Sequence, residues 1–228
     1  MNTIISVIGA GTMGSGIAQV AGTHGCQVNI IDSFPEALEN SQSKLKSILN
    51  RLVEKGKINK EQFKSILARI HWTANMDEIS NSNMVIEAIV ENLEIKQDLF
   101  LQMESMVSDD CILATNTSSL SVAKIASVCK QKSRIIGIHF FNPVPLMKLV
   151  EIIPTEEANG KLLLEVISIL KGWGKSVVTA KDTPGFIVNR VARPYYGEAL
   201  RIYEEGIADF ATIDWAMKEF GGFRMGPF

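Results

Sequence analysis

The sequence lacks the features that mark membrane, nucleic-acid-binding and disulfide-bonded proteins. Its 228 residues contain no run of about 18 apolar residues, so we expect no segment to span a membrane. The net charge is −2 and no basic block occurs, which argues against nucleic acid as a partner. The three cysteines, Cys26, Cys111 and Cys129, are an odd number without C-x-x-C spacing, and this favours the reducing cytoplasm.

Histidine is also scarce, with three in the chain, and the sequence predicts no metal site. Hydrophobic residues make up 46% and charged residues 21%, which supports a large core in one large domain or two smaller ones. A β-branched apolar run begins at Thr3, so we expect no signal or transit peptide ahead of it. Cys26 and Cys111 stand where strands are predicted to start and are expected to pack as small apolar residues.

The chain opens on a glycine-rich motif between a strand and a helix. Residues 3–8 form a short apolar run typical of a buried parallel strand, and glycines follow in the spacing G-x-G-x-x-G. In that motif the first glycine permits a tight turn, the second lets a pyrophosphate approach the backbone, and the third lets the helix pack close to the sheet. Free N–H groups at the start of the helix then face the phosphates. The residues expected to bind a dinucleotide here are Gly9, Ala10, Gly11, Thr12, Met13 and Gly14.

An acidic residue ends the second predicted strand. Asp32 stands 23 positions after Gly9 and directly after the strand at 27–31, close to the separation of about 20 in dinucleotide-binding motifs. A carboxylate at this place accepts hydrogen bonds from the adenosine ribose hydroxyls and would repel a 2′-phosphate. Because no Arg follows at Ser33 or Phe34, the sequence favours NAD over NADP. The alternative is a glycine-rich turn with an unrelated surface aspartate.

Strands and helices alternate through most of the chain. This alternation predicts βαβ units in an α/β fold, a Rossmann-type doubly wound sheet that is mostly parallel. Ser33 and Glu36 are expected to form a capping box, and Asn59 to cap the next helix. Predicted strands cover residues 3–8, 27–31, 71–74, 84–88, 112–115, 134–141, 147–153 and 176–180, and the helices between them cover residues 35–55, 60–69, 93–107, 121–128 and 159–173.

The pattern changes near Asp182, at the sequence Thr-Pro-Gly. After this point only helical patterns occur, at residues 186–205 and 210–220, and Pro194 is expected to kink the first of them. The sequence therefore predicts a dinucleotide-binding domain at residues 1–182 and an all-helical domain at residues 183–228.

His139 and Glu151 are the candidates for acid–base chemistry. His139 lies near the carboxyl end of an apolar strand, the edge at which open α/β sheets bind ligands, and imidazole exchanges protons near neutral pH. Glu151 lies inside the next apolar strand, where an unpaired acid is unfavourable. If the strands are neighbours, the carboxylate can fix the tautomer of the imidazole. The alternatives are a histidine that only satisfies core hydrogen bonds and an edge strand with Glu151 facing water.

Three motifs resemble the short-chain L-3-hydroxyacyl-CoA dehydrogenases, including the 3-hydroxybutyryl-CoA enzymes. They are GIHFFNP at residues 137–143, TNTSSL at 115–120 and DTPGFIVNR at 182–190, and the similarity covers the whole chain. Residues 189–195 also resemble bacterial relatives that act on 3-hydroxyadipyl-CoA. The resemblance implies NAD-dependent, reversible oxidation of (S)-3-hydroxyacyl-CoA to 3-oxoacyl-CoA, as in fatty acid β-oxidation.

The same resemblance assigns roles to individual residues. His139 matches the catalytic base and Glu151 its partner, while Ser118 matches a serine near the substrate hydroxyl and the nicotinamide. Asn189 matches an active-site asparagine that also contacts substrate. The further positions matched to the cofactor or its crevice are Glu91, Lys96, Asn116 and Asn142. For CoA the candidate is a lysine at the end of the second helix, Lys55 or Lys57, and a solvated lysine is the alternative.

Members of this family continue beyond the string that ends at Phe228, so the helical domain is expected to be incomplete. A homodimer is expected of the family, but the further helices supply much of its interface, so the oligomeric state stays open. Two other functions also stay open. One is a non-catalytic NAD-binding protein of the same fold, and the other is a β-hydroxyacid dehydrogenase for free acids, which would use a lysine where this chain has His139.

Overall fold

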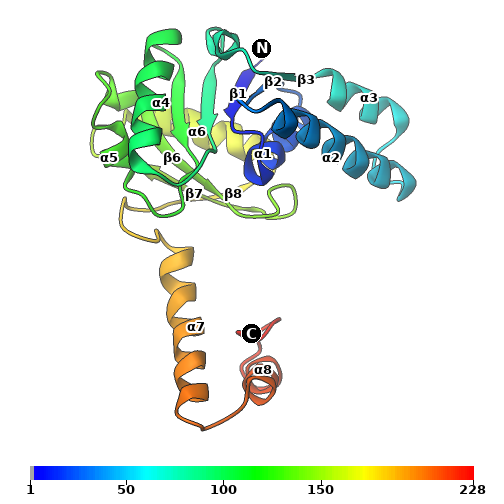
Figure 1. Ribbon diagram of the computed structural model, residues 1–228, viewed down its shortest axis with the longest axis vertical. Helices are drawn as coiled ribbons and strands as arrows, with labels where there is room; N and C mark the ends of the chain where they lie inside the picture. The colour runs from blue at the N-terminus through cyan, green and yellow to red at the C-terminus, as the bar shows by residue number, and fades with distance from the viewer. Residues whose placement is uncertain (1–2) are drawn as a thin grey trace. The chain divides into compact units, whose positions relative to one another are not determined.

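Short apolar strands alternate with amphipathic helices in the computed structural model, which describes residues 3–228 (Figure 1). The described residues divide into two units, the first ending at Thr183 and the second spanning Pro184–Phe228. The strands of the first unit are β1 (Ile4–Ile8), β2 (Gln27–Ile31), β3 (Ile70–Thr73), β4 (Met84–Glu87), β5 (Ile112–Thr115), β6 (Ile135–Phe140), β7 (Leu149–Pro154) and β8 (Ser176–Thr179). Its α-helices are α1 (Thr12–Thr23), α2 (Pro35–Glu54), α3 (Lys60–Ala68), α4 (Leu93–Met106), α5 (Val122–Ala126) and α6 (Gly160–Gly172), with 3-10 turns at Met76–Ile79 and Lys132–Arg134.

All eight strands form one sheet, in the order β3-β2-β1-β4-β5-β6-β7-β8. Neighbouring strands are parallel except β6 and β7, which are antiparallel. The predicted Rossmann-type, mostly parallel sheet is therefore confirmed. The strand order reverses its direction between β1 and β4, and ligands of such sheets bind at the carboxyl ends of the strands beside this reversal.

Helices cover both faces of the sheet. On one face α1, α2 and α6 pack against the strands through buried side chains such as Ile17, Leu49 and Val166. On the other face α4 and α5 do the same, with Phe100 and Ile125. In Figure 1, α2 and α3 run side by side next to the β2–β3 side of the sheet. In this three-layer arrangement the helices cover the two faces of the sheet, and the central strands continue into loops at their carboxyl ends.

The start of α2 differs from the sequence prediction. The capping box expected of Ser33 and Glu36 is wrong, because Phe34 is the N-cap residue and no side chain caps it within the described residues. Pro35 occupies the first helical turn, where its fixed φ suits the helix and its missing N–H needs no partner. The Asp32 carboxylate instead accepts the Phe34 N–H at 3.0 Å.

The predicted cap of α3 is confirmed. The Asn59 side chain accepts the Gln62 N–H at 2.8 Å, and the Gln62 side chain accepts the Asn59 N–H at the same distance. These reciprocal bonds satisfy two backbone donors that the helix itself leaves without partners.

The second unit contains α7 (Val188–Glu204) and α8 (Phe210–Glu219). Helix α7 continues through Pro194. Asp209 caps α8 by accepting the Thr212 N–H at 2.8 Å. Phe210 packs between two other rings, with ring centroids 4.0 Å from Tyr203 and 4.4 Å from Phe228. Among the described residues, no helix of the chain combines the length and the apolar character needed to cross a bilayer.

The three cysteines are free thiols and buried, and Cys26 and Cys111 immediately precede β2 and β5 as expected. Burial among apolar side chains disfavours the thiolate. It raises the pKa of Cys111 to about 11, and burial together with the nearby Glu104 charge raises the pKa of Cys129 to about 11 as well.

We predict that these two thiols make the fold less stable above pH 9. In the unfolded chain they ionise near pH 9.0, whereas in the folded chain they ionise near pH 11. A rise in pH through this window therefore stabilises the unfolded state, by about 1 kcal/mol per thiol at pH 10. Urea unfolding at pH 8 and pH 10 measures the loss. Between pH 8 and pH 10, the free energy of unfolding should fall less in the Cys111→Ala/Cys129→Ala variant than in the parent chain. An equal fall in both proteins would contradict the role given to the two thiols.

Candidate active site

The glycine-rich loop fills the narrow space between β1, β4 and α1. Gly9 has a φ of +105°, and a Cβ on it would lie 2.5 Å from the Ala88 carbonyl oxygen. A Cβ on Gly14 would lie 1.8 Å from the Gly9 carbonyl oxygen. At Gly11, in contrast, a Cβ would have no atom within 4 Å, so open space lies outside this part of the backbone. The first and third glycines are thus required by packing, and the second leaves room for a ligand.

The start of α1 is suited to hold an anion. Gly11 is its N-cap residue, no side chain of the described residues caps the helix, and no acidic side chain stands in its first turn. The first N–H groups and the positive end of the helix therefore remain available to phosphate oxygens.

Asp32 links this loop to the end of β2. Its carboxylate accepts the Ala10 N–H at 2.7 Å and the Phe34 N–H at 3.0 Å. A carboxylate offers about four acceptor positions, so two remain for hydroxyl groups of a ribose. Together with the open Gly11 backbone and the uncapped helix, this donor and acceptor set fits a dinucleotide cofactor with a free 2′-hydroxyl.

His139 and Glu151 meet across the antiparallel pair of β6 and β7. The two residues are directly opposite each other, and the His139 Nδ1 lies 2.7 Å from the Glu151 Oε2. The imidazole is 5% exposed and the carboxylate is fully buried. The Phe141 ring lies against the imidazole, with centroids 4.5 Å apart. The contact expected from the sequence is therefore present, in a setting with little water to weaken it.

Glu91 organises the loop that carries Ser118. Its Oε1 accepts the Ser118 N–H at 2.9 Å, the Ser119 N–H at 3.1 Å and the Thr117 hydroxyl. Burial alone would raise the pKa of the Glu91 carboxyl, but the bonds from Thr117 and Ser118 and the charge of Lys96 hold that pKa below its ordinary value. The carboxylate thus stays ionised and fixes the Ser118 backbone.

Lys96 lies beneath this loop and is fully buried. Its Nζ contacts the Glu87 Oε1 and lies 3.3 Å from the Glu91 Oε2. Glu87 also accepts the Ile89 N–H at 2.8 Å and the Thr115 hydroxyl at 2.7 Å. Sequence reasoning missed Glu87, although an acid inside the apolar strand at 84–87 indicates a buried partner, as it did for Glu151.

The remaining predicted residues fall in different places. Asn116 follows β5, and its side chain accepts the Phe140 N–H at 2.9 Å, which ties the ends of β5 and β6 together. Asn142 lines a cavity beside α1. Lys55 is the exposed C-cap residue of α2 and is not among the residues that line this cavity. Asn189 belongs to the second unit, near the start of α7.

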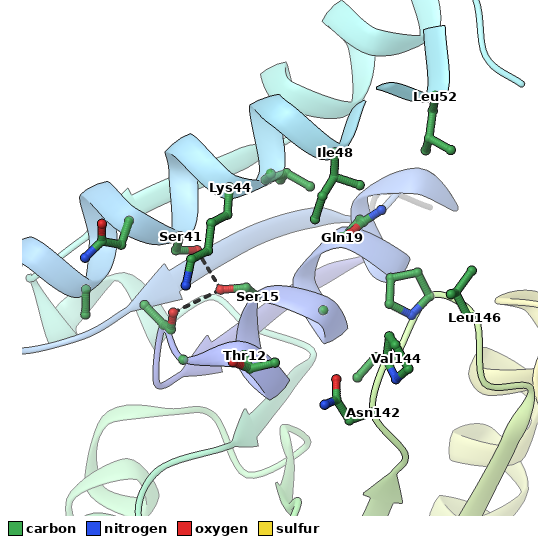
Figure 2. A pocket seen from close by; sticks show the side chains of 18 residues that line it. Thr12, Ser15, Gln19, Ser41, Lys44, Ile48, Leu52, Asn142, Val144 and Leu146 are labelled. Atoms are coloured by element: carbon green, nitrogen blue, oxygen red, sulfur yellow. Dashed lines mark hydrogen bonds between the residues drawn. The ribbon is translucent and has the colours of Figure 1, made fainter. Parts of the chain in front are cut away.

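The cavity has a volume of about 560 Å³, in the range of small-molecule sites. It lies between α1, α2 and the loop that joins β6 to β7 (Figure 2). Thr12 and Asn142 give it a polar end beside the glycine-rich loop, and Ile48, Leu52 and Leu146 give it an apolar wall. Lys44 is the basic side chain in its lining and points into it from α2.

A buried lysine supports the loop that forms one wall of this cavity. The Lys175 Nζ donates to the carbonyl oxygens of Val144 and Met147, the latter at 2.8 Å. Burial lowers the pKa of Lys175, since desolvation disfavours the ammonium form. Sequence reasoning missed this residue, because its partners are two backbone carbonyls about 30 positions earlier in the chain.

Models of known protein families match both units of the chain. Residues 4–183 match "3-hydroxyacyl-CoA dehydrogenase, NAD binding domain", and residues 185–228 match "3-hydroxyacyl-CoA dehydrogenase, C-terminal domain". The chain belongs to the 3-hydroxyacyl-CoA dehydrogenase family. The resemblance seen in its motifs is thereby confirmed, and the NAD-binding domain supports NAD as the cofactor of this family member.

Curated relatives and solved structures agree with this membership. A Caenorhabditis elegans protein named "Probable 3-hydroxyacyl-CoA dehydrogenase" is 44% identical over 98% of this chain and 74% of its own length. The 3-hydroxyadipyl-CoA dehydrogenase of Escherichia coli is 42% identical over 98% of this chain, which spans 47% of that protein. The crystal structure of an E. coli 3-hydroxybutyryl-CoA dehydrogenase superimposes with a TM-score of 0.97 at 41% identity, over all of this chain and 48% of that one.

We predict that Lys96 is required for the stability of the first unit. Lys96→Met would leave the fully buried Glu87 carboxylate without its cation, and this should lower the free energy of unfolding by about 3–5 kcal/mol. Urea unfolding measures the loss.

The Lys96→Met/Glu87→Gln variant is the matched control, because it removes both charges. It should be more stable than the single variant. A loss below about 1 kcal/mol for Lys96→Met would mean that the ion pair contributes little.

Proposed function

We propose that this chain is an NAD-dependent 3-hydroxyacyl-CoA dehydrogenase that interconverts (S)-3-hydroxyacyl-CoA and 3-oxoacyl-CoA. The observation that carries the proposal is the buried His139–Glu151 pair, whose Nδ1 and Oε2 atoms lie 2.7 Å apart. The pair lies on β6 and β7 of the sheet that also carries the dinucleotide motif, in a domain that matches this family. Neither the fold nor the dinucleotide motif by itself requires such a pair.

NAD, when bound, supplies the acceptor for the hydride that leaves the substrate's C3. His139 takes the hydroxyl proton. In this mechanism the Nδ1–H of the neutral imidazole donates a hydrogen bond to Glu151, so the ring presents Nε2 to the substrate hydroxyl and becomes imidazolium when it takes the hydroxyl proton. The carboxylate stabilises that imidazolium, and in the reverse direction His139 returns the proton.

Ser118 is proposed to hold the substrate oxygen that becomes the carbonyl. Ser118 is suited to this task because Glu91 and its bonds to three consecutive residues fix the loop. A loop that is already held in place before substrate binds avoids reorganisation during the reaction. The active-site role of Asn189, a residue of the second unit, stays a prediction from the family resemblance.

The cavity beside α1 is proposed to accept part of the CoA thioester. Lys44, Ile48, Leu52 and Lys55 recur at spacings of four, four and three along α2, so they lie on one face of the helix. The apolar Ile48 and Leu52 lie between Lys44 and Lys55, whose positions are about 16 Å apart along the axis of α2. This order suits a ligand with an uncharged arm and a phosphorylated end, and Lys55 stays the proposed partner of the phosphates.

A homodimer and a cytoplasmic location stay predictions. The first rests on the family resemblance. The second rests on the three free thiols, which fit a reducing compartment.

The direct test mixes the chain with acetoacetyl-CoA and NADH and follows the loss of reduced-cofactor absorbance. We expect turnover with NADH, little with NADPH because of Asp32, and none with free acetoacetate. Binding of NADH without turnover would favour the non-catalytic alternative. Turnover of the free acid would favour a hydroxyacid dehydrogenase.

We predict that His139→Ala lowers the rate by about 10²- to 10⁴-fold, the contribution of a general base. The affinity for NADH should change little, because the imidazole contacts Glu151 rather than the glycine-rich loop. Steady-state rates and NADH titration measure the two effects. His71→Ala is the matched control, since His71 is an exposed residue of β3. A near-parental rate for His139→Ala would exclude this histidine as the base.

A further inference from the structure

A line of hydrogen bonds leads from β3 through α2 and α1 to the glycine-rich loop. The Trp72 Nε1 donates to the Ser41 Oγ at 3.0 Å, and the Ser41 and Ser15 hydroxyls lie 2.8 Å apart. Ser15 in turn donates to the Ala10 carbonyl oxygen at 2.9 Å. Figure 2 shows the last two bonds as dashed lines, one between α2 and α1 and one from α1 to the loop before it. The four residues come from β3, α2, α1 and the loop before α1.

The Ser15 hydroxyl lies within hydrogen-bond distance of two acceptors. The Ala10 carbonyl can only accept and the Trp72 N–H can only donate. Ser15 donates toward the Ala10 carbonyl oxygen at 2.9 Å and toward the Ser41 Oγ at 2.8 Å, so these two acceptors share its single hydroxyl proton, and Ser41 also accepts from Trp72. Because Ser41 is only 2% exposed, water cannot easily take the place of its hydroxyl group if a substitution removes it.

The end of the line controls a backbone group of the dinucleotide motif. The Ala10 carbonyl and the Gly11 N–H belong to the same planar trans peptide, so they point in opposite directions. The preceding peptide is held as well, because the Ala10 N–H donates to Asp32 at 2.7 Å. With both peptides fixed, the Gly11 N–H has a set direction at the start of α1, where phosphate oxygens bind in such motifs.

We propose that Ser15 and Ser41, supported by Trp72, are positioning residues for NAD that hold the Gly11 N–H in its binding direction. The inference rests on the proposed function, since it concerns the same cofactor site. It adds residues outside the glycine motif, and Ser41 and Trp72 stand 26 and 57 positions after Ser15. None of the three is required to touch the cofactor.

The test is the binding of NADH to the full chain by isothermal titration calorimetry. Ser15→Ala and Ser41→Ala should each raise the dissociation constant about 3- to 10-fold, the effect of one hydrogen bond. Ser15→Thr keeps the hydroxyl and should bind within about 2-fold of the parent. Because both serines act in one line, the double alanine variant should bind about as weakly as the weaker single variant.

Ser43→Ala is the matched control, since Ser43 is an exposed serine on the opposite face of the same helix. It should leave NADH binding unchanged. In the steady state, the alanine variants of the line should raise the KM for NADH and keep kcat at saturating NADH, whereas general loss of folding would lower kcat as well.

Two results would overturn the inference, namely parental affinity in both single variants, or additive losses in the double variant. The proposed function is tested separately by turnover of acetoacetyl-CoA by the parent chain. If the parent chain turns over acetoacetyl-CoA and the serine variants bind NADH with parental affinity, the positioning role of Ser15 and Ser41 is refuted and the proposed function is not. If the parent chain binds NADH but does not turn over acetoacetyl-CoA, and the serine variants bind NADH more weakly, the proposed function is refuted and the positioning role of the serines is not.

Discussion

The antiparallel pairing of β6 with β7 is the constraint on which the candidate active site depends. It places His139 directly opposite Glu151, whereas every other pair of neighbouring strands in the described sheet is parallel. Side chains alternate between the faces of a strand, so a slip of one residue would turn Glu151 to the other face and leave an apolar neighbour beside the imidazole. The register is thus fixed by the same burial that makes the carboxylate dependent on its partner.

Buried charges recur around the His139–Glu151 end of the sheet, and each has polar partners. Lys96 joins Glu87 to Glu91, and Lys175 holds two carbonyls of the loop after β6. Such groups would be unfavourable in the core if they lacked partners. In this protein the buried charged groups fix the loops that carry Ser118 and Asn142. The polar groups of these loops are therefore held in position before a ligand binds.

Local signals in the sequence predicted most of the fold. The glycine spacing, the position of Asp32 and the cap at Asn59 depend on contacts within a few residues or within one βαβ unit. The capping box at Ser33 was wrong because Pro35 and the Asp32 carboxylate together shape that turn, and pattern matching treats each residue separately. Lys175 and Ser41 were missed because their partners lie 28 or more and 26 or more positions away.

The sequence by itself determined the class of fold, the preference for NAD and the family, since each is written in short motifs whose spacing reflects local backbone geometry. Only the tertiary structure decided that His139 and Glu151 touch, that Lys96 is fully buried between two acids, and that a line of hydroxyl groups reaches the Ala10 carbonyl. These contacts depend on strand order, register and the packing of helices on the sheet. Such features bring together residues whose separation along the chain carries no signal of their distance in space.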